Sequence, residues 1–283
     1  MDLPVDPLSQ PRFLLGAKGQ SRGVLLIHGF SGSPFELHLL AERLHQAGYH
    51  VAVPLLAGHH RSLRALADSS WQDWLSSAEK ALHELQERIA CTTSESPRLA
   101  VIGFSMGGLL SLELSRRHPP PGPSSDLAVE GKAEPCVRAL ALLATPLWLP
   151  AWQERAIVRL ARLGGIGRLA VPKLAGRDLR ARDLPKAPLK PWGMPLRALA
   201  SLVELMQAVR GHLDEVQQPT LLAHGQHDHT VPPGCLDGLA SGLGTPAERI
   251  ERLVLPRSFH ILPLDVEREQ LFTALLAHID RHL

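Results

Sequence analysis

The feature that most constrains the fold is a serine between glycines at residues 103–107, Gly-Phe-Ser-Met-Gly. An apolar run, Leu-Ala-Val-Ile, leads into it, and a long Leu-rich segment follows. This order predicts a buried strand, a very tight turn and a helix, with Ser105 at the apex of the turn. We expect glycine at 103 and 107 because strand and helix pass so close there that a Cβ would clash. Such a turn holds the Ser105 hydroxyl out into solvent.

Five further apolar runs have the length and composition of buried strands, and helical patterns lie between them. The runs are residues 24–27, 51–54, 139–144, 219–223 and 251–255. Runs that are apolar at nearly every position are typical of strands buried on both faces. The chain is therefore predicted to be an α/β protein whose mostly parallel sheet has about six or seven strands, with helices on both faces.

Two helix starts carry a capping pattern, in which a serine is followed three residues later by a carboxylate. Ser33 and Glu36 precede a helix expected to end at Gly48, and Ser70 and Asp73 precede a helix expected to reach Ile89. In each pair we expect the serine side chain and the carboxylate to satisfy each other's backbone N–H groups.

The alternation of strands and helices stops at residues 147–217, which are predicted to form a small helical cap inserted before the strand that starts at 219. The core is then residues 1–146 and 218–283. Two amphipathic patterns, at 151–163 and 196–209, predict the helices of the cap. Between residues 147 and 200 eleven basic residues stand against three acidic ones. A solvated rim is the favoured interpretation, and transient contact with an anionic membrane surface is the alternative.

Length and charge exclude several other classes of protein. The 283 residues suit one large domain with an insertion, and the net charge of +2 is too small to indicate nucleic acid as a partner. Residues 1–11 lack a positively charged start followed by an apolar core, so we expect no secretion signal there. No apolar run has the length of a membrane span, and three scattered cysteines do not suggest disulfides. We expect a cytoplasmic protein without stable membrane insertion. Residues 119–135, rich in Pro, Gly, Ser and charge, predict a surface loop.

A serine hydroxyl is a weak nucleophile and needs a base, normally a histidine that a carboxylate holds in place. Where a serine occupies such a turn, the acid and then the histidine follow it in the chain, in loops at strand ends. Asp228 follows the strand at 219–223, and His260 follows the strand at 251–255. The sequence therefore predicts a triad of Ser105, Asp228 and His260.

Two other carboxylates compete for the role of the acid. Asp237 is expected in the helix after the Asp228 loop. Asp265 is expected at the surface or as a cap near the last helix. Both positions favour Asp228.

A metal site is the rival interpretation of the loop around Asp228. His224, His227 and His229 crowd around it, and the pair His59-His60 could complete a ligand set. However, adjacent residues of an extended loop point in opposite directions, and the spacing matches no known ligand pattern. We therefore expect no metal at this loop.

A serine that attacks a carbonyl also needs donors that stabilise the oxyanion formed on the carbonyl oxygen. Met106, at the start of the helix after Ser105, offers one backbone N–H. Phe30, in the turn after the strand at 24–27, is expected to offer the second. His28 is expected to hold that turn by a side-chain hydrogen bond.

With these motifs in place, the chain resembles the α/β-hydrolase superfamily, specifically its small microbial carboxylesterases and monoacylglycerol lipases. The resemblance covers nearly the whole chain and rests on His-Gly-Phe-Ser-Gly at 28–32, Gly-His at 58–59, Trp-Gln-Asp-Trp at 71–74, Gly-Phe-Ser-Met-Gly-Gly at 103–108, His-Asp at 227–228, Val-Pro at 231–232, Ser-Phe-His at 258–260 and Leu-Asp at 264–265. It implies the α/β-hydrolase fold and hydrolysis of short to medium acyl esters or monoacylglycerols through an acyl-enzyme, without a cofactor. The chain departs from the pattern at His60, where the group has glycine, and at Phe259, which places a bulky ring beside His260.

Alternatives with the same triad remain open: acyl transfer, thioester cleavage and amide cleavage. A binding protein on a hydrolase scaffold is also possible in principle, because fold does not fix function. Dehalogenase chemistry is disfavoured because the turn carries Ser105 where an aspartate nucleophile would be needed.

Overall fold

The computed structural model describes residues 6–120, 134–163, 167, 169–171, 178–183 and 193–283. Most of the surface loop predicted at 119–135 lies outside these residues, as do parts of the predicted cap. No helix among the described residues is both long enough and apolar enough to cross a membrane.

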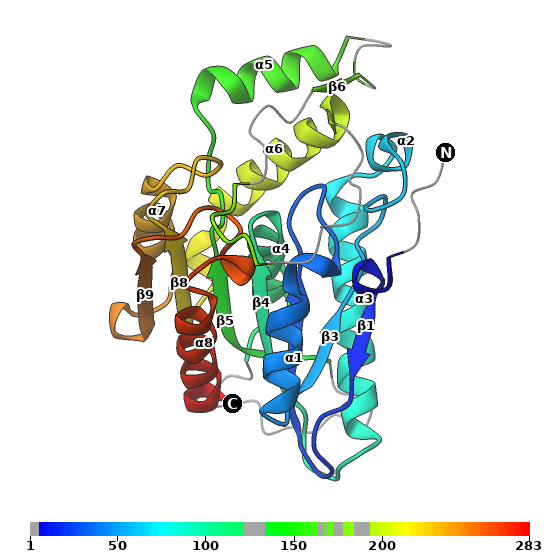
Figure 1. The fold of residues 1–283 in the computed structure, drawn as a ribbon, viewed down its shortest axis with the longest axis vertical. Helices are drawn as coiled ribbons and strands as arrows, with labels where there is room; N and C mark the ends of the chain where they lie inside the picture. The colour runs from blue at the N-terminus through cyan, green and yellow to red at the C-terminus, as the bar shows by residue number, and fades with distance from the viewer. Residues whose placement is uncertain (1–5, 121–133, 164–166, 168, 172–177, 184–192) are drawn as a thin grey trace.

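A seven-stranded sheet forms the centre of the molecule, with strand order β1-β3-β2-β4-β5-β8-β9 (Figure 1). Its strands are β1 (Arg12–Leu14), β2 (Arg22–Ile27), β3 (His50–Val53), β4 (Arg98–Phe104), β5 (Val137–Leu143), β8 (Thr220–Gly225) and β9 (Ile250–Leu255). All neighbours pair in parallel except β1, which runs antiparallel to β3 at one edge. The predicted mostly parallel sheet is confirmed. The prediction missed β1 because three half-buried residues at an edge carry no recognisable period.

In the central strands, alternate residues enter two different hydrophobic cores. In β2, Leu25 and Ile27 belong to one core, and Val24 and Leu26 belong to the other. Successive side chains of a strand point to opposite faces, so two buried faces require apolar residues throughout. This is why the runs in the sequence are continuous and do not alternate with polar residues.

Helices cover both faces of the sheet. The helices are α1 (His38–Gln46), α2 (Leu63–Ala67), α3 (Trp71–Ala90), α4 (Met106–Arg117), α5 (Ala151–Ala161), α6 (Leu196–Arg210), α7 (Gly234–Gly242) and α8 (Arg268–His282). α1 and α8 lie together on the face nearer the viewer in Figure 1, and α3 and α4 lie behind the sheet. Both faces are therefore excluded from water, as the apolar strands require.

The two predicted capping boxes have different outcomes. At the start of α3 the box is present: the Ser70 side chain accepts from Asp73 N–H, and Asp73 accepts from Ser70 N–H. At Ser33 the box is wrong, since the chain there forms the 3₁₀-helix η2 (Pro34–Leu37) without a side-chain cap. The Glu36 carboxylate instead accepts a hydrogen bond from Gly29 N–H at 3.3 Å. It therefore supports the turn after β2 rather than its own helix.

The segment between β5 and β8 contains both helices predicted for the cap. α6 begins at Leu196 and buries Leu202, Val203 and Leu205. α5 lies across the outer side of α6, at the end of the molecule farthest from the C-terminus in Figure 1. An ion pair of 3.1 Å between Glu154 and Arg210 joins the two helices. A short hairpin, β6 (Ala170–Val171) with β7 (Met194–Pro195), was not predicted because two-residue strands have no period.

Candidate active site

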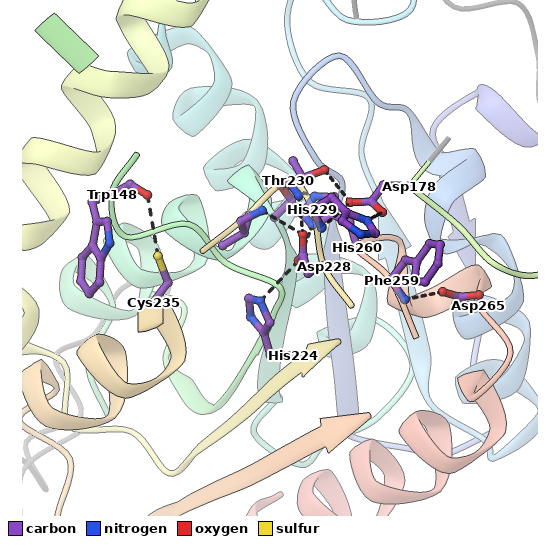
Figure 2. Close-up of polar contacts among 12 residues, drawn as sticks. Trp148, Asp178, His224, Asp228, His229, Thr230, Cys235, Phe259, His260 and Asp265 are labelled. Carbon is purple, nitrogen blue, oxygen red and sulfur yellow. Dashed lines mark hydrogen bonds and ion pairs between the residues drawn. The ribbon is translucent and has the colours of Figure 1, made fainter. Parts of the chain in front are cut away.

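Ser105, Asp228 and His260 come together although 155 residues separate the serine from the histidine. They follow β4, β8 and β9, whose carboxyl ends share one edge of the sheet. His260 Nε2 lies 3.1 Å from Ser105 Oγ. His260 Nδ1 lies 2.8 Å from Asp228 Oδ2, and Figure 2 shows these two residues side by side. All three residues are buried. The carboxylate can only accept, so Nδ1 carries the proton and Nε2 is left to accept the proton of the serine hydroxyl.

Ser105 has a backbone conformation that only its surroundings can enforce. Its φ is 53° and its ψ is −122°, a region that residues other than glycine rarely adopt. Such a residue costs on the order of 1–3 kcal/mol, which the neighbouring packing must offset. A Cβ on Gly103 would lie 2.2 Å from the carbonyl oxygen of Gly107, and one on Gly107 would lie 2.1 Å from that of Ile27. The steric reason expected for both glycines is confirmed.

Asp228 is held in place from both sides of its carboxylate. Oδ1 accepts the backbone N–H groups of Thr230 and Val231, each at 2.8 Å, while Oδ2 accepts from His260. Burial tends to raise the pKa of Asp228, but the hydrogen bonds from His260, Val231 and Thr230 outweigh it and lower the pKa below the usual value. The carboxylate therefore stays ionised at neutral pH, as the orienting partner of a catalytic histidine must.

The loops that carry Asp228 and His260 are joined by backbone hydrogen bonds. Gln226 N–H donates to the carbonyl of Leu255 at 3.0 Å, and His227 N–H donates to that of Ser258 at 3.1 Å. Gly225 allows this approach, because a Cβ there would lie 2.2 Å from the carbonyl oxygen of Phe259. These bonds join the first residues of the two loops, ahead of Asp228 and His260 themselves.

The turn after β2 is held by His28, as predicted. Its Nε2 accepts from Leu56 N–H at 3.2 Å, so Nδ1 carries the proton and donates to the carbonyl of Gly29 at 2.9 Å. For the backbone N–H groups of Phe30 and Met106, the structure records no hydrogen-bond acceptor within the residues it describes. Both N–H groups therefore stay candidates for binding an oxyanion.

The two competing acids lie in different surroundings. Asp237 is in α7 as predicted, exposed, and paired with Arg252 at 2.9 Å. Asp265 was expected at the surface or as a cap near the last helix, and the surface alternative is wrong: Asp265 is fully buried. Its carboxylate accepts the N–H groups of Phe259, Arg180 and Ala181. These hydrogen bonds compensate the cost of burying the Asp265 carboxylate, which explains how a carboxylate can occupy this position.

The histidines that suggested a metal site point in different directions. His224 lies buried beneath Asp228, with Nε2 at 3.4 Å from Oδ2, and burial lowers the pKa of His224. The rings of His227 and His229 both pack against Phe259, which therefore turns toward the Asp228 loop. His59 packs against Phe30 and Trp74.

Across the described parts of the chain, one group of three ligand-type side chains could share an ion, and it lies elsewhere: Glu251, His278 and His282. Arg281 already binds the Glu251 oxygen that His278 contacts, each within 2.9 Å. A cation would have to displace this arginine, so we interpret the group as an ion-pair network between β9 and α8.

Two residues of this region carried no signal in the sequence. Asp178 contacts the loop of Asp228, but it lies in the inserted segment, where no periodic pattern is available to place it. Glu267 accepts from Ser258 Oγ at 2.7 Å and from Arg257 N–H at 2.9 Å. Burial tends to raise the pKa of Glu267, but these two partners lower it overall. A carboxylate just before the last helix could equally have been a surface residue.

Comparison with known proteins identifies relatives along almost the whole chain. The family model described as serine aminopeptidase, S33, matches residues 19–267. A thermostable monoacylglycerol lipase of Bacillus sp. (strain H-257) is 28% identical over 260 residues, which cover 92% of this chain and 91% of that protein. A carboxylesterase of Bacillus subtilis (strain 168) is 22% identical, with 89% of each chain covered.

Solved structures show the same architecture. A structure reported with the metagenome-derived lipolytic enzymes LipS and LipT superposes with a TM-score of 0.80 at 26% identity, covering 99% of this chain and 100% of that one. The monoacylglycerol lipase of Paleococcus ferrophilus gives a TM-score of 0.72 at 18% identity, with 96% and 98% covered. The second likeness bears on the fold alone, and both agree with the α/β-hydrolase fold.

Proposed function

Because this chain belongs to the serine aminopeptidase S33 family, a family of serine hydrolases with the α/β-hydrolase fold, we propose that it hydrolyses carboxylic esters with Ser105, His260 and Asp228 as its triad. The observation that carries the proposal is the continuous hydrogen-bond chain from Ser105 Oγ through the His260 ring to Asp228. Serine, histidine and carboxylate in this order are the arrangement that activates a hydroxyl for attack on a carbonyl.

Each residue has a defined part in the proposed reaction. His260 Nε2 takes the proton of Ser105 as Oγ attacks the ester carbonyl carbon, and the tetrahedral oxyanion accepts hydrogen bonds from the N–H groups of Phe30 and Met106. Asp228 stabilises the positive charge on His260. The C–O bond then breaks, the alcohol leaves with the proton from His260, and an acyl-Ser105 remains. Water repeats the cycle and releases the acid.

The relatives support a substrate class. The two similar proteins named above are a monoacylglycerol lipase and a carboxylesterase. We infer short to medium acyl esters or monoacylglycerols as substrates. We also infer that the segment between β5 and β8 acts as a cap, since its described residue Asp178 contacts the loop of Asp228 and the residue after His260.

A panel of substrates tests this proposal and separates it from peptidase activity, which the name of the family suggests. We expect hydrolysis of p-nitrophenyl esters from acetate to decanoate and of monoacylglycerols, with kcat/KM falling for palmitate. An aminoacyl p-nitroanilide, whose amide is harder to cleave, is expected to react far more slowly. The matched thioester and a trial with glycerol as an acyl acceptor complete the panel. Faster cleavage of the anilide than of every ester would replace the proposal with aminopeptidase activity.

We also propose that the cap makes transient contact with anionic lipid surfaces. No residue of α5, all of which the structure describes, is buried. Its outer side exposes Trp152 at 70% together with Arg155 and Arg159. A helix that combines arginines with exposed aromatic and aliphatic side chains is suited to the interface of a bilayer. Leu163 and Leu169, at 49% and 61% exposed, extend the apolar surface.

Sedimentation with vesicles measures this contact. We expect the protein to bind phosphatidylglycerol vesicles at low salt, and the double variant Arg155→Glu/Arg159→Glu to lose most of that binding, since each basic residue contributes about 1 kcal/mol. The control is Arg252→Glu/Arg281→Glu, which changes the same charge on β9 and α8, far from the cap. Equal binding by both variants, or none by the unaltered protein, would refute the contact.

A further inference from the structure

The described residues 178–183 belong to the inserted segment, but most of their hydrogen bonds are with the loops of the core that carry the acid and the base. Asp178 is 8% exposed, although it is neither a triad residue nor part of a helix or strand. A buried carboxylate is costly unless several donors compensate it. The hydrogen-bond partners of Asp178 therefore show which parts of the chain its carboxylate holds together.

On one side, the Asp178 carboxylate binds the loop of Asp228. Oδ2 accepts from His229 N–H at 2.9 Å and from Thr230 Oγ at 2.8 Å, and Oδ1 lies 3.0 Å from His229 Nδ1 (Figure 2). Thr230 is the residue whose own N–H donates to Asp228 Oδ1. Asp178 therefore orders the turn that orients the catalytic carboxylate.

On the other side, the same short segment binds the loop of His260. The carbonyl of Asp178 accepts from Ile261 N–H at 3.1 Å, directly after the base. The N–H groups of Arg180 and Ala181 both donate to Asp265 Oδ1 at 2.9 Å, and the other oxygen of Asp265 accepts from Phe259 N–H at 2.7 Å, directly before the base. His260 is thus flanked on both sides by residues tied to this segment.

We propose that Asp178 is a positioning residue through which the cap fixes the distance between acid and base. The proposal rests on the proposed function of Ser105, Asp228 and His260. Asp178 touches none of the reacting atoms, and it acts by linking the Thr230 turn to Ile261. A displacement of about 1 Å in a catalytic constellation can cost up to about a hundredfold in rate, so a link between the two loops has a measurable kinetic effect.

The chain offers a matched control five residues away. Asp183 belongs to the same segment, but its carboxylate is 63% exposed and pairs with Arg268 of α8 at 2.7 Å. This pair lies outside both loops. Replacing Asp183 by alanine removes the same chemical group and a link between the segment and the core, but leaves the Thr230 turn and Ile261 unchanged.

The experiment compares Asp178→Ala, Asp178→Asn and Asp183→Ala with the unaltered protein. A fluorophosphonate probe first counts the reactive serines in each preparation, and kcat and KM for p-nitrophenyl butyrate are then expressed per labelled site. We expect kcat to fall roughly ten- to a hundredfold in Asp178→Ala with KM changed less than about threefold. Asp178→Asn keeps one acceptor oxygen, so its kcat is expected to lie between those of Asp178→Ala and the unaltered protein. Asp183→Ala is expected to have the kcat of the unaltered protein.

A second variant keeps the proposal testable if Asp178→Ala does not fold. Thr230→Val removes the hydroxyl that donates to Asp178 but keeps the size of the side chain and the N–H that binds Asp228. We expect Thr230→Val to lower kcat per labelled site roughly threefold. The double variant Thr230→Val/Asp178→Asn is expected to have the same kcat as Asp178→Asn alone, because both changes remove the same link.

The possible outcomes separate the two proposals. If the unaltered protein takes up no probe, the proposed function fails. If it is labelled, and Asp178→Ala and Thr230→Val both turn over like Asp183→Ala, the positioning role is overturned while the triad stands. If the Asp178 variants only lower the fraction of labelled protein, with kcat per site unchanged, Asp178 is structural and the proposal is likewise overturned.

Discussion

Replacing Ser105 with alanine is expected to lower kcat for ester hydrolysis by about six orders of magnitude and to abolish labelling by a fluorophosphonate. The reason is that Ser105 Oγ is the one hydroxyl within hydrogen-bond distance of His260 Nε2 among the described residues, at 3.1 Å. Without this hydroxyl the acyl-enzyme cannot form, and no proton can pass from residue 105 to His260. The residual rate should be that of water attack on an ester held by the oxyanion donors.

The measurement needs a protein that is folded, which circular dichroism and a thermal melt establish. Ser241→Ala is a suitable control, because Ser241 is an exposed serine of α7 whose hydroxyl bonds only its own helix. It should keep full activity and full labelling. Ester hydrolysis by Ser105→Ala near the rate of the unaltered protein would remove Ser105 as the nucleophile, whatever the other residues do.

The sheet and the serine turn could be predicted because the physical causes act over short stretches of sequence. Strands buried on both faces must be apolar throughout, and a serine at a φ of 53° needs glycine on both sides of the turn. Both requirements can be recognised in the sequence, because each concerns residues only a few positions apart. The edge strand β1 and the hairpin of β6 and β7 are too short to show such a pattern.

The buried carboxylates could not be predicted in the same way, because their partners are distant in the sequence. Asp265 lies six residues from Phe259 but about eighty-five from Arg180, and only the fold brings the three together. Glu36 shows the same limitation within one helix. Its spacing from Ser33 fits a capping box, but the Glu36 carboxylate accepts a hydrogen bond from Gly29 N–H in the preceding turn. A local pattern fails where a buried donor elsewhere competes for the same oxygen.

Asp228→Asn is expected to lower kcat by about four orders of magnitude with little change in stability. The hydrogen bonds of Asp228 explain why. Oδ1 accepts two backbone N–H groups, from Thr230 and Val231, so the amide oxygen of an asparagine must take that position. Its NH₂ group then faces His260 Nδ1 and donates to it. The proton of the imidazole moves to Nε2, which can no longer accept the proton of Ser105.

The same reasoning sets the controls for Asp228→Asn. Asp237→Asn removes a carboxylate that lies exposed in α7 and pairs with Arg252, and an exposed pair of this kind contributes at most about 1 kcal/mol. Its kcat should stay within about twofold of the unaltered protein, because an exposed charge outside both loops does not alter their geometry.

Asp265→Asn replaces an oxygen that must accept backbone N–H groups, so its main effect should be a lower melting temperature. A kcat loss of the expected size in Asp237→Asn, with Asp228→Asn active, would transfer the role of the acid to α7. Near-normal kcat in Asp228→Asn alone would mean that His260 keeps its tautomer without an ionised partner.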